Sequence, residues 1–339
     1  MFIQNHNPAS ALEKANSEFV KSILPDYLRQ AAGLKHGSAR QLAELRHTDL
    51  EQLAKEISPS HRSVNSRDFA DSMTDSMSAL LSDIWPDYSK RLDPFCRVFE
   101  VENFKPVSVN EIIFPEMEIQ ENQDLGFETS VGNPENRGRV YDKVELGFST
   151  PAQLQTFETK FRVSPQLWAT HGESLARALQ HQSVAFANLE LRLLSGVLTQ
   201  NPNLSDSAAL FTAENSTASA LDATTMDTAL DWLATGSPAC LPPSGLLIGP
   251  GKEYAARKLL TDAGMNLPIV VSPWLATGSW YLFSNPVQHA AILRLREKGG
   301  YQAPRMGWTN LFEGQKGYFA AIDCGFSAIS QTGVFRGGV

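Results

Sequence analysis

Residues 249–253 are the part of the chain that comes closest to a nucleotide-binding turn, because GPGKE joins an apolar run to a helical pattern. A phosphate-binding loop needs Ser or Thr directly after its lysine to hold Mg²⁺, whereas Glu253 follows Lys252 here. Tyr254 stands where a dinucleotide-binding turn would have its third glycine, three residues after Gly251. A carboxylate in the first turn of a helix suits the helix dipole better than a bound phosphate does. The sequence therefore predicts no cofactor at this turn.

Nucleophilic and metal sites have no better support in the sequence. Ser149, in LGFSTPA, and Ser327, in CGFSAIS, both lack the second glycine of the turn that exposes a catalytic serine. His171 and His181 fall on different faces of a predicted helix, so they are badly placed to share a metal ion. The cysteines have no paired spacing and are expected to be ordinary buried thiols: Cys96, Cys240 and Cys324. We therefore expect no catalytic residue, cofactor or metal, although a cytosolic α/β enzyme that uses residues 249–262 stays an alternative.

The composition is that of a globular protein with room for one large domain or two ordinary ones. The chain has 339 residues, of which 42% are hydrophobic and 19% charged, and its net charge is −8. This charge gives no basic field for nonspecific binding of nucleic acid. The longest apolar runs, such as residues 267–271, are far shorter than the ~20 residues that cross a bilayer. The N-terminal MFIQNHNPAS has no secretory signal, so we expect the protein to stay in the cytoplasm where it is made.

The first half of the chain has a helical region and a hairpin pattern. Residues 9–58 indicate short helices with capping-box spacings, and the polar residues 58–68 indicate a linker. Residues 114–163 indicate two strands around a polar tip at 126–140, and the returning strand alternates cleanly over 156–163. Such a hairpin cannot bury both faces against its own domain, so it needs a partner.

A long helix and an α/β unit follow the hairpin. From residue 172 the pattern is helical for about thirty residues, which makes a rod of roughly 40 Å. The residues of its apolar stripe are Leu175, Leu179, Phe186, Leu189, Leu193 and Val197. Helices are then expected at 225–234 and 252–262, and strands at 245–249, 268–272, 318–324 and 327–335. Together these patterns predict an α+β chain.

The order of several short motifs gives the chain a family resemblance. GLLIGPGKEYAARKLL and LPIVVSPWL are followed by WYLFSNP at 280–286, QAP at 302–304 and DCGFSAISQTGVFRGG at 323–338. In this order they resemble the C-terminal half of tailed-bacteriophage major capsid proteins with the Hong Kong 97-like fold, which are relatives of prohead protease fusions. The resemblance covers residues 66–339 and implies a shell subunit. Because the chain begins at Met1 with only a short helical region, removal of a long N-terminal scaffold segment is not expected.

The resemblance implies an α+β fold with an N-terminal arm, an E-loop hairpin, a long spine helix in a peripheral domain, and an α/β axial domain. Axial domains of such proteins meet around the five-fold and six-fold centres of the shell. The implied regions are 1–65 for the N-terminal helical region and linker, 66–113 for the arm and the start of the peripheral domain, 114–163 for the E-loop hairpin, 164–204 for the spine helix, 205–315 for the axial domain, and 316–339 for the return to the peripheral domain.

The resemblance also implies the function and the partners. Copies of the chain would self-assemble as hexamers and pentamers into an icosahedral head that encloses double-stranded DNA without sequence-specific binding. A portal protein, and scaffolding and decoration proteins, would be further partners, and no membrane would be involved. The protein would be part of the virion and would assemble in the host bacterial cytoplasm. An encapsulin-like compartment, which would hold cargo proteins in place of DNA, shares the fold and stays an alternative.

The E-loop is the implied contact between subunits, because in such proteins it lies across a neighbouring subunit. The residues assigned to this contact are Phe127, Asn133, Arg137, Arg139 and Lys143. Some relatives form a covalent cross-link between an E-loop lysine and an asparagine of a neighbour, and Lys143 has a compatible position. A buried glutamate assists this reaction, so a lysine, an asparagine and a glutamate from different subunits would have to meet. We therefore do not assign a cross-link to Lys143.

Overall fold

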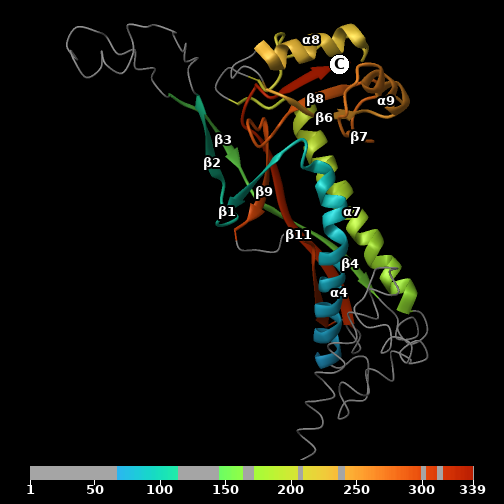
Figure 1. Cartoon of the computed structure of the whole chain (residues 1–339). Coiled ribbons are helices and arrows are strands. Elements are labelled where there is room, and N and C mark those ends of the chain that lie inside the picture. The colour runs from blue at the N-terminus through green and yellow to red at the C-terminus, as the bar shows by residue number, and fades with distance from the viewer. Residues whose placement is uncertain are drawn as a thin grey trace, which may run out of the picture.

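The computed structural model describes most of the chain from residue 67 onward (Figure 1). The described ranges are 67–113, 145–162, 172–204, 209–235, 241–298, 303–310 and 316–338. Three expectations lie outside them, namely the N-terminal helical region of 1–65, the hairpin tip of 126–140, and the contact residues Phe127, Asn133, Arg137, Arg139 and Lys143.

Two long helices lie side by side along one half of the molecule (Figure 1). They are α4 (Arg67–Ser89) and α7 (Gly172–Gln200), and the short 3-10 helix η1 (Lys90–Leu92) follows α4 directly. The apolar residues of α4 recur at helical spacing and are buried: Met77, Leu80, Leu81, Ile84 and Trp85. α7 confirms the helix predicted from residue 172, whereas α4 was not predicted. No helix in the described ranges is long and apolar enough to cross a bilayer.

The buried face of α7 differs from the predicted apolar stripe in the second half of the helix. Leu179 and Phe186 are buried as expected, but Leu189, Leu193 and Val197 are only half-buried. The covered positions there are Glu190, Leu191, Leu194, Ser195 and Leu198. The helix is therefore rotated relative to its hydrophobic pattern, and this rotation brings a carboxylate into the core.

The first sheet packs against α7 and takes strands from distant parts of the chain. Its order is β1 (Arg97–Val101), β9 (Ile292–Glu297), β11 (Lys316–Ala328) and β10 (Arg305–Asn310), and β4 (Gln155–Arg162) also pairs with β11. β1 and β9 run parallel, while β11 pairs antiparallel with β9, β10 and β4. β11 therefore pairs with every other strand of this sheet except β1, which pairs with β9.

The returning strand of the expected hairpin is divided in the structure. Residues 114–163 were expected to form one pair of long strands, but the returning chain is interrupted at Leu154. Before this point β3 (Glu145–Ala152) pairs with β2 (Val107–Ile113) in a two-stranded ribbon, and after it β4 pairs with β11. Leu154 is buried in an apolar cluster that includes residues of β1 and β9. Burial of this side chain therefore fixes the point where the ribbon leaves the first sheet.

A second sheet forms the other half of the molecule. Its order is β5 (Ser216–Thr217), β12 (Val334–Gly337), β8 (Trp280–Ser284), β6 (Pro243–Ile248) and β7 (Ile269–Val271). α8 (Ala223–Thr235) packs by β12, and α9 (Glu253–Asp262) contacts β7. The two helices and the first two strands predicted for the α/β unit are thereby confirmed.

The two expected final strands, 318–324 and 327–335, lie in different sheets. β11 runs beside α7 and continues to Ala328, whereas β12 begins at Val334 and pairs with β8 and β5. The rings of Trp280 on β8 and Phe335 on β12 stack with centroids 5.8 Å apart. The C-terminal strand is therefore held in the core of the second sheet.

Replacing Leu80 with Ala tests whether α4 is an integral part of the fold. The side chain is fully buried, so we expect its loss to lower the free energy of unfolding by about 2–5 kcal/mol. Urea denaturation of the unassembled subunit measures this change. The control is Ser82→Ala on the exposed side of α4, which should stay within about 0.5 kcal/mol of the unmodified protein. An equally small effect of Leu80→Ala would contradict the packing described for α4.

Candidate functional site

The glycine-rich turn at residues 249–253 starts α9 and brings its own carboxylate to the helix start. Lys252 occupies the N-cap position, and Glu253 accepts hydrogen bonds from Arg257 at 3.0 Å from Nε and 2.7 Å from Nη2. A Cβ atom at Gly249 would lie 2.1 Å from the backbone oxygen of Ala276, so close packing of the backbone explains this glycine. The turn therefore has the carboxylate expected from the sequence where a phosphate would have to bind.

A cluster of one imidazole and two hydroxyls was not found from the sequence. His289 Nε2 lies 3.0 Å from Ser330 Oγ and also hydrogen-bonds Thr332 Oγ1, and these hydroxyl oxygens lie 2.8 Å apart. Burial lowers the pKa of the His289 imidazole, which keeps the ring neutral near pH 7. The three residues come from the chain after β8 and the loop before β12, so the cluster ties these segments together. His289 and the two hydroxyl residues are about forty positions apart in the sequence, so no short motif indicates this cluster.

The described cysteines are buried, and their thiols stay protonated near neutral pH. Burial raises the pKa of the Cys96 and Cys324 thiols to about 12. Cys96 Sγ donates a hydrogen bond to the backbone oxygen of Leu92, at 3.2 Å. The expectation of ordinary buried thiols is confirmed for these two residues, and Cys240 lies outside the described ranges. Within those ranges, no group of three or more His, Cys, Asp or Glu side chains could hold a metal ion.

The strongest electrostatic feature is a fully buried carboxylate on α7, Glu190, which lies between two buried arginines of β9. Arg294 donates from Nε to Glu190 Oε1 at 3.2 Å and from Nη2 to Oε2, so this pair is bidentate. Arg296 donates from Nη2 to Glu190 Oε1. Burying three charges costs several kcal/mol per ion unless each finds partners. The structure meets this requirement by placing both guanidinium groups against the Glu190 carboxylate.

The two arginines extend this charged core to other elements. Arg294 Nη2 donates to Ser89 Oγ at the end of α4, at 2.8 Å, and Nη1 lies 3.8 Å from Asp93 Oδ1. Burial raises the pKa of the Asp93 carboxyl, and the charge of Arg294 acts in the opposite direction. Arg296 Nη1 donates to the backbone oxygen of Asp323 on β11 at 3.2 Å. The charged core therefore connects both long helices to two strands of the first sheet.

Asp323 carries the network to the remaining strands of the first sheet. Its Oδ1 accepts a hydrogen bond from Thr156 Oγ1 on β4 at 2.6 Å, and its Oδ2 lies 3.0 Å from Arg305 Nη2 on β10. Every strand of the first sheet except β1 thus contributes to one chain of polar contacts. Such a network rigidifies the base of the β2–β3 ribbon, since β3 leads directly into β4.

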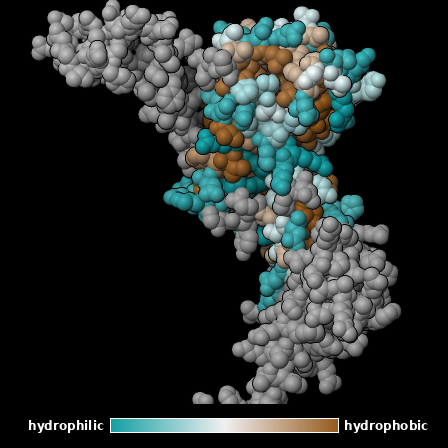
Figure 2. Space-filling model, in the orientation of Figure 1, coloured by the Kyte–Doolittle hydropathy of each residue, from teal (hydrophilic) through white to brown (hydrophobic). Residues whose placement is uncertain are grey.

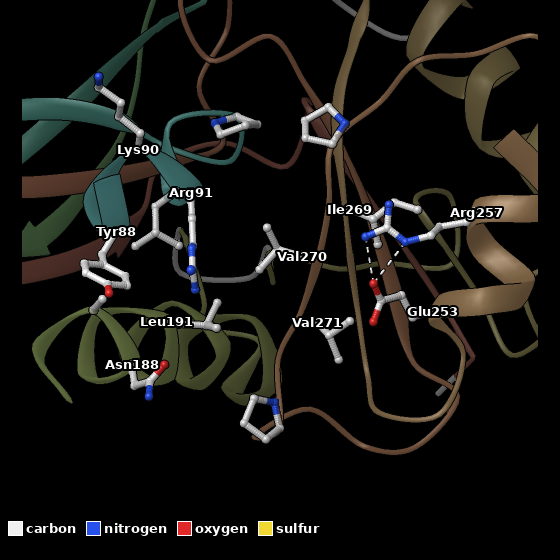
Figure 3. A pocket seen from close by; sticks show the side chains of 15 residues that line it. Tyr88, Lys90, Arg91, Asn188, Leu191, Glu253, Arg257, Ile269, Val270 and Val271 are labelled. Carbon is white, nitrogen blue, oxygen red and sulfur yellow. Dashed lines mark hydrogen bonds and ion pairs between the residues drawn. The ribbon is translucent and has the colours of Figure 1, made fainter. Parts of the chain in front are cut away.

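A groove of about 600 Å³ separates the two halves of the molecule (Figure 3). α7 and η1 contribute one side of its lining, and the edge strand β7 and α9 contribute the other. The Arg91 guanidinium lies 5.2 Å from the centroid of the Tyr88 ring, and the ion pair of Glu253 and Arg257 lies on the opposite side. Among the described lining residues, no acid, base and nucleophile are brought together. The groove therefore lies along the seam between the two packed halves.

Exposed large apolar side chains gather on the segment from β1 to β2. Val98, Phe99 and Phe104 are 46%, 36% and 40% exposed, respectively. The other exposed large apolar residues of the described surface are scattered over the second half: Tyr254, Trp274 and Val287. Figure 2 shows hydrophobic surface near the place that β1 and β9 occupy in Figure 1. An apolar edge beside a two-stranded ribbon is typical of a surface that another protein molecule covers.

The comparison with protein families agrees with these observations. The sequence profile of a family described as phage capsid protein matches residues 147–336, which is more than half of the chain. The chain belongs to this phage capsid protein family. A search of curated proteins with this chain finds no match.

Several solved structures are similar to this capsid protein at low sequence identity. The virus-like particle from Pyrococcus furiosus has a TM-score of 0.49 and 14% identity, and the match covers 78% of this chain and 98% of that chain. The encapsulin complex from Synechococcus elongatus has a TM-score of 0.47 and 11% identity, covering 75% and 87%. The protein of Mycobacterium phage Patience has a TM-score of 0.47 and 13% identity, covering 78% and 87%. The family assignment rests on the profile match.

Membership of the phage capsid family decides several of the sequence-based expectations. The protein is a major capsid protein, a structural subunit of the virion shell and not an enzyme, and its copies associate with one another. Its α+β fold is also as predicted. The function of this molecule therefore depends on its surfaces, and on the packing that holds those surfaces in place.

Replacing Glu190 with Gln removes the charge that the two buried arginines share. Both guanidinium groups would lose their buried carboxylate partner, so we expect the free energy of unfolding to fall by about 3–5 kcal/mol. Guanidinium chloride denaturation of the unassembled subunit measures this change in the free energy of unfolding. Glu214→Gln, at an exposed position, is the matched control and should change stability by less than about 0.5 kcal/mol. Equal stability of the two variants would show that the charged core contributes nothing.

His289 predicts a pH dependence of stability. Its pKa in the folded protein is lowered from 6.5, so the unfolded chain binds the proton more readily. The stabilisation is fully present above pH 6.5 and is lost as the pH falls from there through the folded-state pKa. Urea denaturation at several pH values should show this loss, and His289→Asn should remove part of the slope. His181→Asn, at an exposed position of α7, serves as the control; the same change of slope in both variants would refute the role of His289.

Proposed function

We propose that this capsid protein has the Hong Kong 97-like fold and builds the icosahedral head of a tailed bacteriophage from hexamers and pentamers. The head would enclose double-stranded DNA and would assemble in the cytoplasm of the host bacterium. The observation that carries this proposal is the β2–β3 ribbon, which forms a sheet of its own beside the two packed sheets. A two-stranded sheet is marginally stable alone, so the ribbon is suited to pack on a neighbouring subunit.

The proposed domains follow the division of the structure into two halves. The peripheral domain consists of α4, α7 as the spine helix, and the first sheet, while the axial domain consists of the second sheet with α8 and α9. This division differs from the expected regions, because β9 and β10 of the expected axial region 205–315 lie in the first sheet, and β12 of the expected return 316–339 lies in the second sheet. β2 and β3 are the arms of the E-loop; β3 lies within the expected hairpin of 114–163, and β2 lies directly before it. The tip residues Phe127, Asn133, Arg137, Arg139 and Lys143 would contact an adjacent subunit. Support for this assignment comes from the order of the elements along the chain.

The proposed partners follow from the charge and from the shell. The net charge of −8 suits a container whose wall does not trap nucleic acid, so we propose that DNA is enclosed without sequence-specific binding. A closed head also needs a portal protein for DNA entry. Scaffolding and decoration proteins would bind during or after assembly. No described residue is assigned to these three partners.

Removal of the E-loop tip side chains tests the proposed function. Replacing residues 126–138 with a Gly-Ser linker of the same length should leave a folded subunit that no longer forms shells, because the tip side chains that hold adjacent subunits are lost. Electron microscopy of gradient fractions detects shells, and circular dichroism checks the fold.

The ratio of ultraviolet absorbance by nucleic acid to that by protein in unmodified particles reports whether they contain nucleic acid. Protein cargo in its place would indicate an encapsulin-like compartment. Intact DNA-filled particles from the variant would refute the role of the tip.

A further inference from the structure

β1 is an edge strand with exposed side chains on both of its faces. It pairs with β9 on one side, and no strand within the described ranges pairs with its other side. Arg97, Val98, Phe99 and Glu100 are all exposed, and only Val101 is buried. Because successive residues of a strand point to opposite faces, exposed side chains lie on both sides of β1.

β1 lacks several of the features that normally protect a sheet edge. Natural edge strands are kept from pairing by charged side chains, especially lysine, and by proline, bulges or very short length. β1 keeps a regular register with β9 over five residues, contains neither lysine nor proline, and has two apolar residues, Val98 and Phe99, between its charged residues Arg97 and Glu100. A strand edge of this kind is a template for pairing with another chain.

The hydrogen bonding of β1 to β9 determines which backbone groups are left for a partner. The backbone oxygen of Val101 accepts a hydrogen bond from Lys298 N–H, at 2.8 Å. In a parallel pair, the residues that bond to one neighbour alternate along the strand. Val101, Phe99 and Arg97 therefore direct their backbone groups toward β9. The N–H and C=O groups of Val98 and Glu100 point to the free edge.

In one symmetric register, the outward groups of Val98 and Glu100 pair with one another. In an antiparallel pair, two residues directly opposite one another exchange both of their hydrogen bonds at alternate positions. If Val98 of one copy lies opposite Glu100 of another, symmetry places Glu100 opposite Val98 as well. All outward N–H and C=O groups of these residues are then paired. Phe99 lies opposite its own counterpart, at the position between the two bonded pairs.

The side chains of β1 fit the same register. Phe99 lies on the same face as Val101, which packs with Leu154, Leu293 and Leu295 in an apolar cluster. Two Phe99 rings brought together would continue this cluster across the contact. Arg97 would face Val101 of the other copy, so no like charges lie directly opposite one another. Two β1 edges are therefore compatible with one another in their backbone hydrogen bonds, their apolar contacts and their charges.

We infer that β1 pairs antiparallel with β1 of a second copy of this chain, across a two-fold axis that passes by Phe99. The contact uses the same surface on both subunits, as a two-fold contact requires. The inference rests in part on the proposed function, because an icosahedral shell supplies two-fold axes between its subunits. The partner is a second copy because copies of a capsid protein associate with one another, and because the register that pairs the outward backbone groups also joins the two Phe99 rings and places no like charges opposite one another.

A cysteine at position 99 tests this register directly. Residues opposite each other between bonded pairs have Cα atoms about 4.5 Å apart, which is within the range of a disulfide. Phe99→Cys subunits should therefore form disulfide-linked dimers under mild oxidation of the assembled protein, seen on a non-reducing gel. Val98→Cys is the matched control, because its two copies would be about 7–8 Å apart on the diagonal and should cross-link much less. Unmodified protein controls for the native cysteines.

The outcome separates the inference from the proposed function. Dimers of Phe99→Cys and not of Val98→Cys support the pairing, even if the particles prove to hold no DNA and the proposed function fails. DNA-filled particles without Phe99→Cys dimers would overturn the pairing and leave the proposed function standing. Preferential dimers of Val98→Cys would overturn the register, and therefore the inference. Particles that hold protein cargo in place of DNA, together with no dimers of Phe99→Cys, would overturn both.

A proline at position 100 provides a second test that does not depend on cysteine chemistry. The N–H of Glu100 points away from β9, so proline should leave the pairing of β1 with β9 intact while removing one outward donor. We expect Glu100→Pro subunits to melt within a few degrees of unmodified subunits and to form far fewer particles. Glu100→Ala, which keeps the donor, should assemble normally. Normal assembly of Glu100→Pro would contradict the pairing.

Discussion

The burial of Glu190 is the constraint on which the rest of the structure depends. A carboxylate inside a protein core needs opposite charge and hydrogen bonds on all sides, and Arg294 and Arg296 supply both. Because these arginines are two residues apart on β9, they project to the same side of that strand. α7 can therefore pack on the first sheet in one rotational setting only. The contact of Arg294 with Ser89 then fixes the end of α4 in the same place.

From this fixed centre the structure extends in two directions. Toward the second sheet, Ser195 of α7 lies 2.7 Å from the hydroxyl of Ser272 just after β7, and both residues are buried. Toward the ribbon, Asp323 connects the arginines to β4 and β10. A shell subunit must present several surfaces to its neighbours in a constant relation to one another. The polar network inside this subunit holds the elements that carry these surfaces in a fixed arrangement.

The sequence predicted the elements with one clear periodicity and missed those whose contacts are long-range. α7 and the α/β unit were predicted because their apolar residues recur regularly. α4 was missed, although Leu80, Leu81 and Ile84 have helical spacing, because the polar residues before it indicated a linker. The core face of α7 was misplaced because Glu190 counts as polar in any hydrophobic pattern, and only its arginine partners make its burial tolerable. The division of β3 from β4 depends on pairing with β11, which lies far away in sequence.

The direct passage from β3 into β4 has a mechanical consequence. β4 pairs with β11 over eight residues, from Gln155 opposite Cys324 to Arg162 opposite Gly317. The hydrogen bonds of an antiparallel pair run perpendicular to the strands. A pull on the ribbon along β4 would therefore load all the bonds of this ladder together, in shear, and could not open them one after another. Tension between neighbouring subunits, such as pressure inside a filled container would produce, would pass through β4 into β11 at the centre of the first sheet.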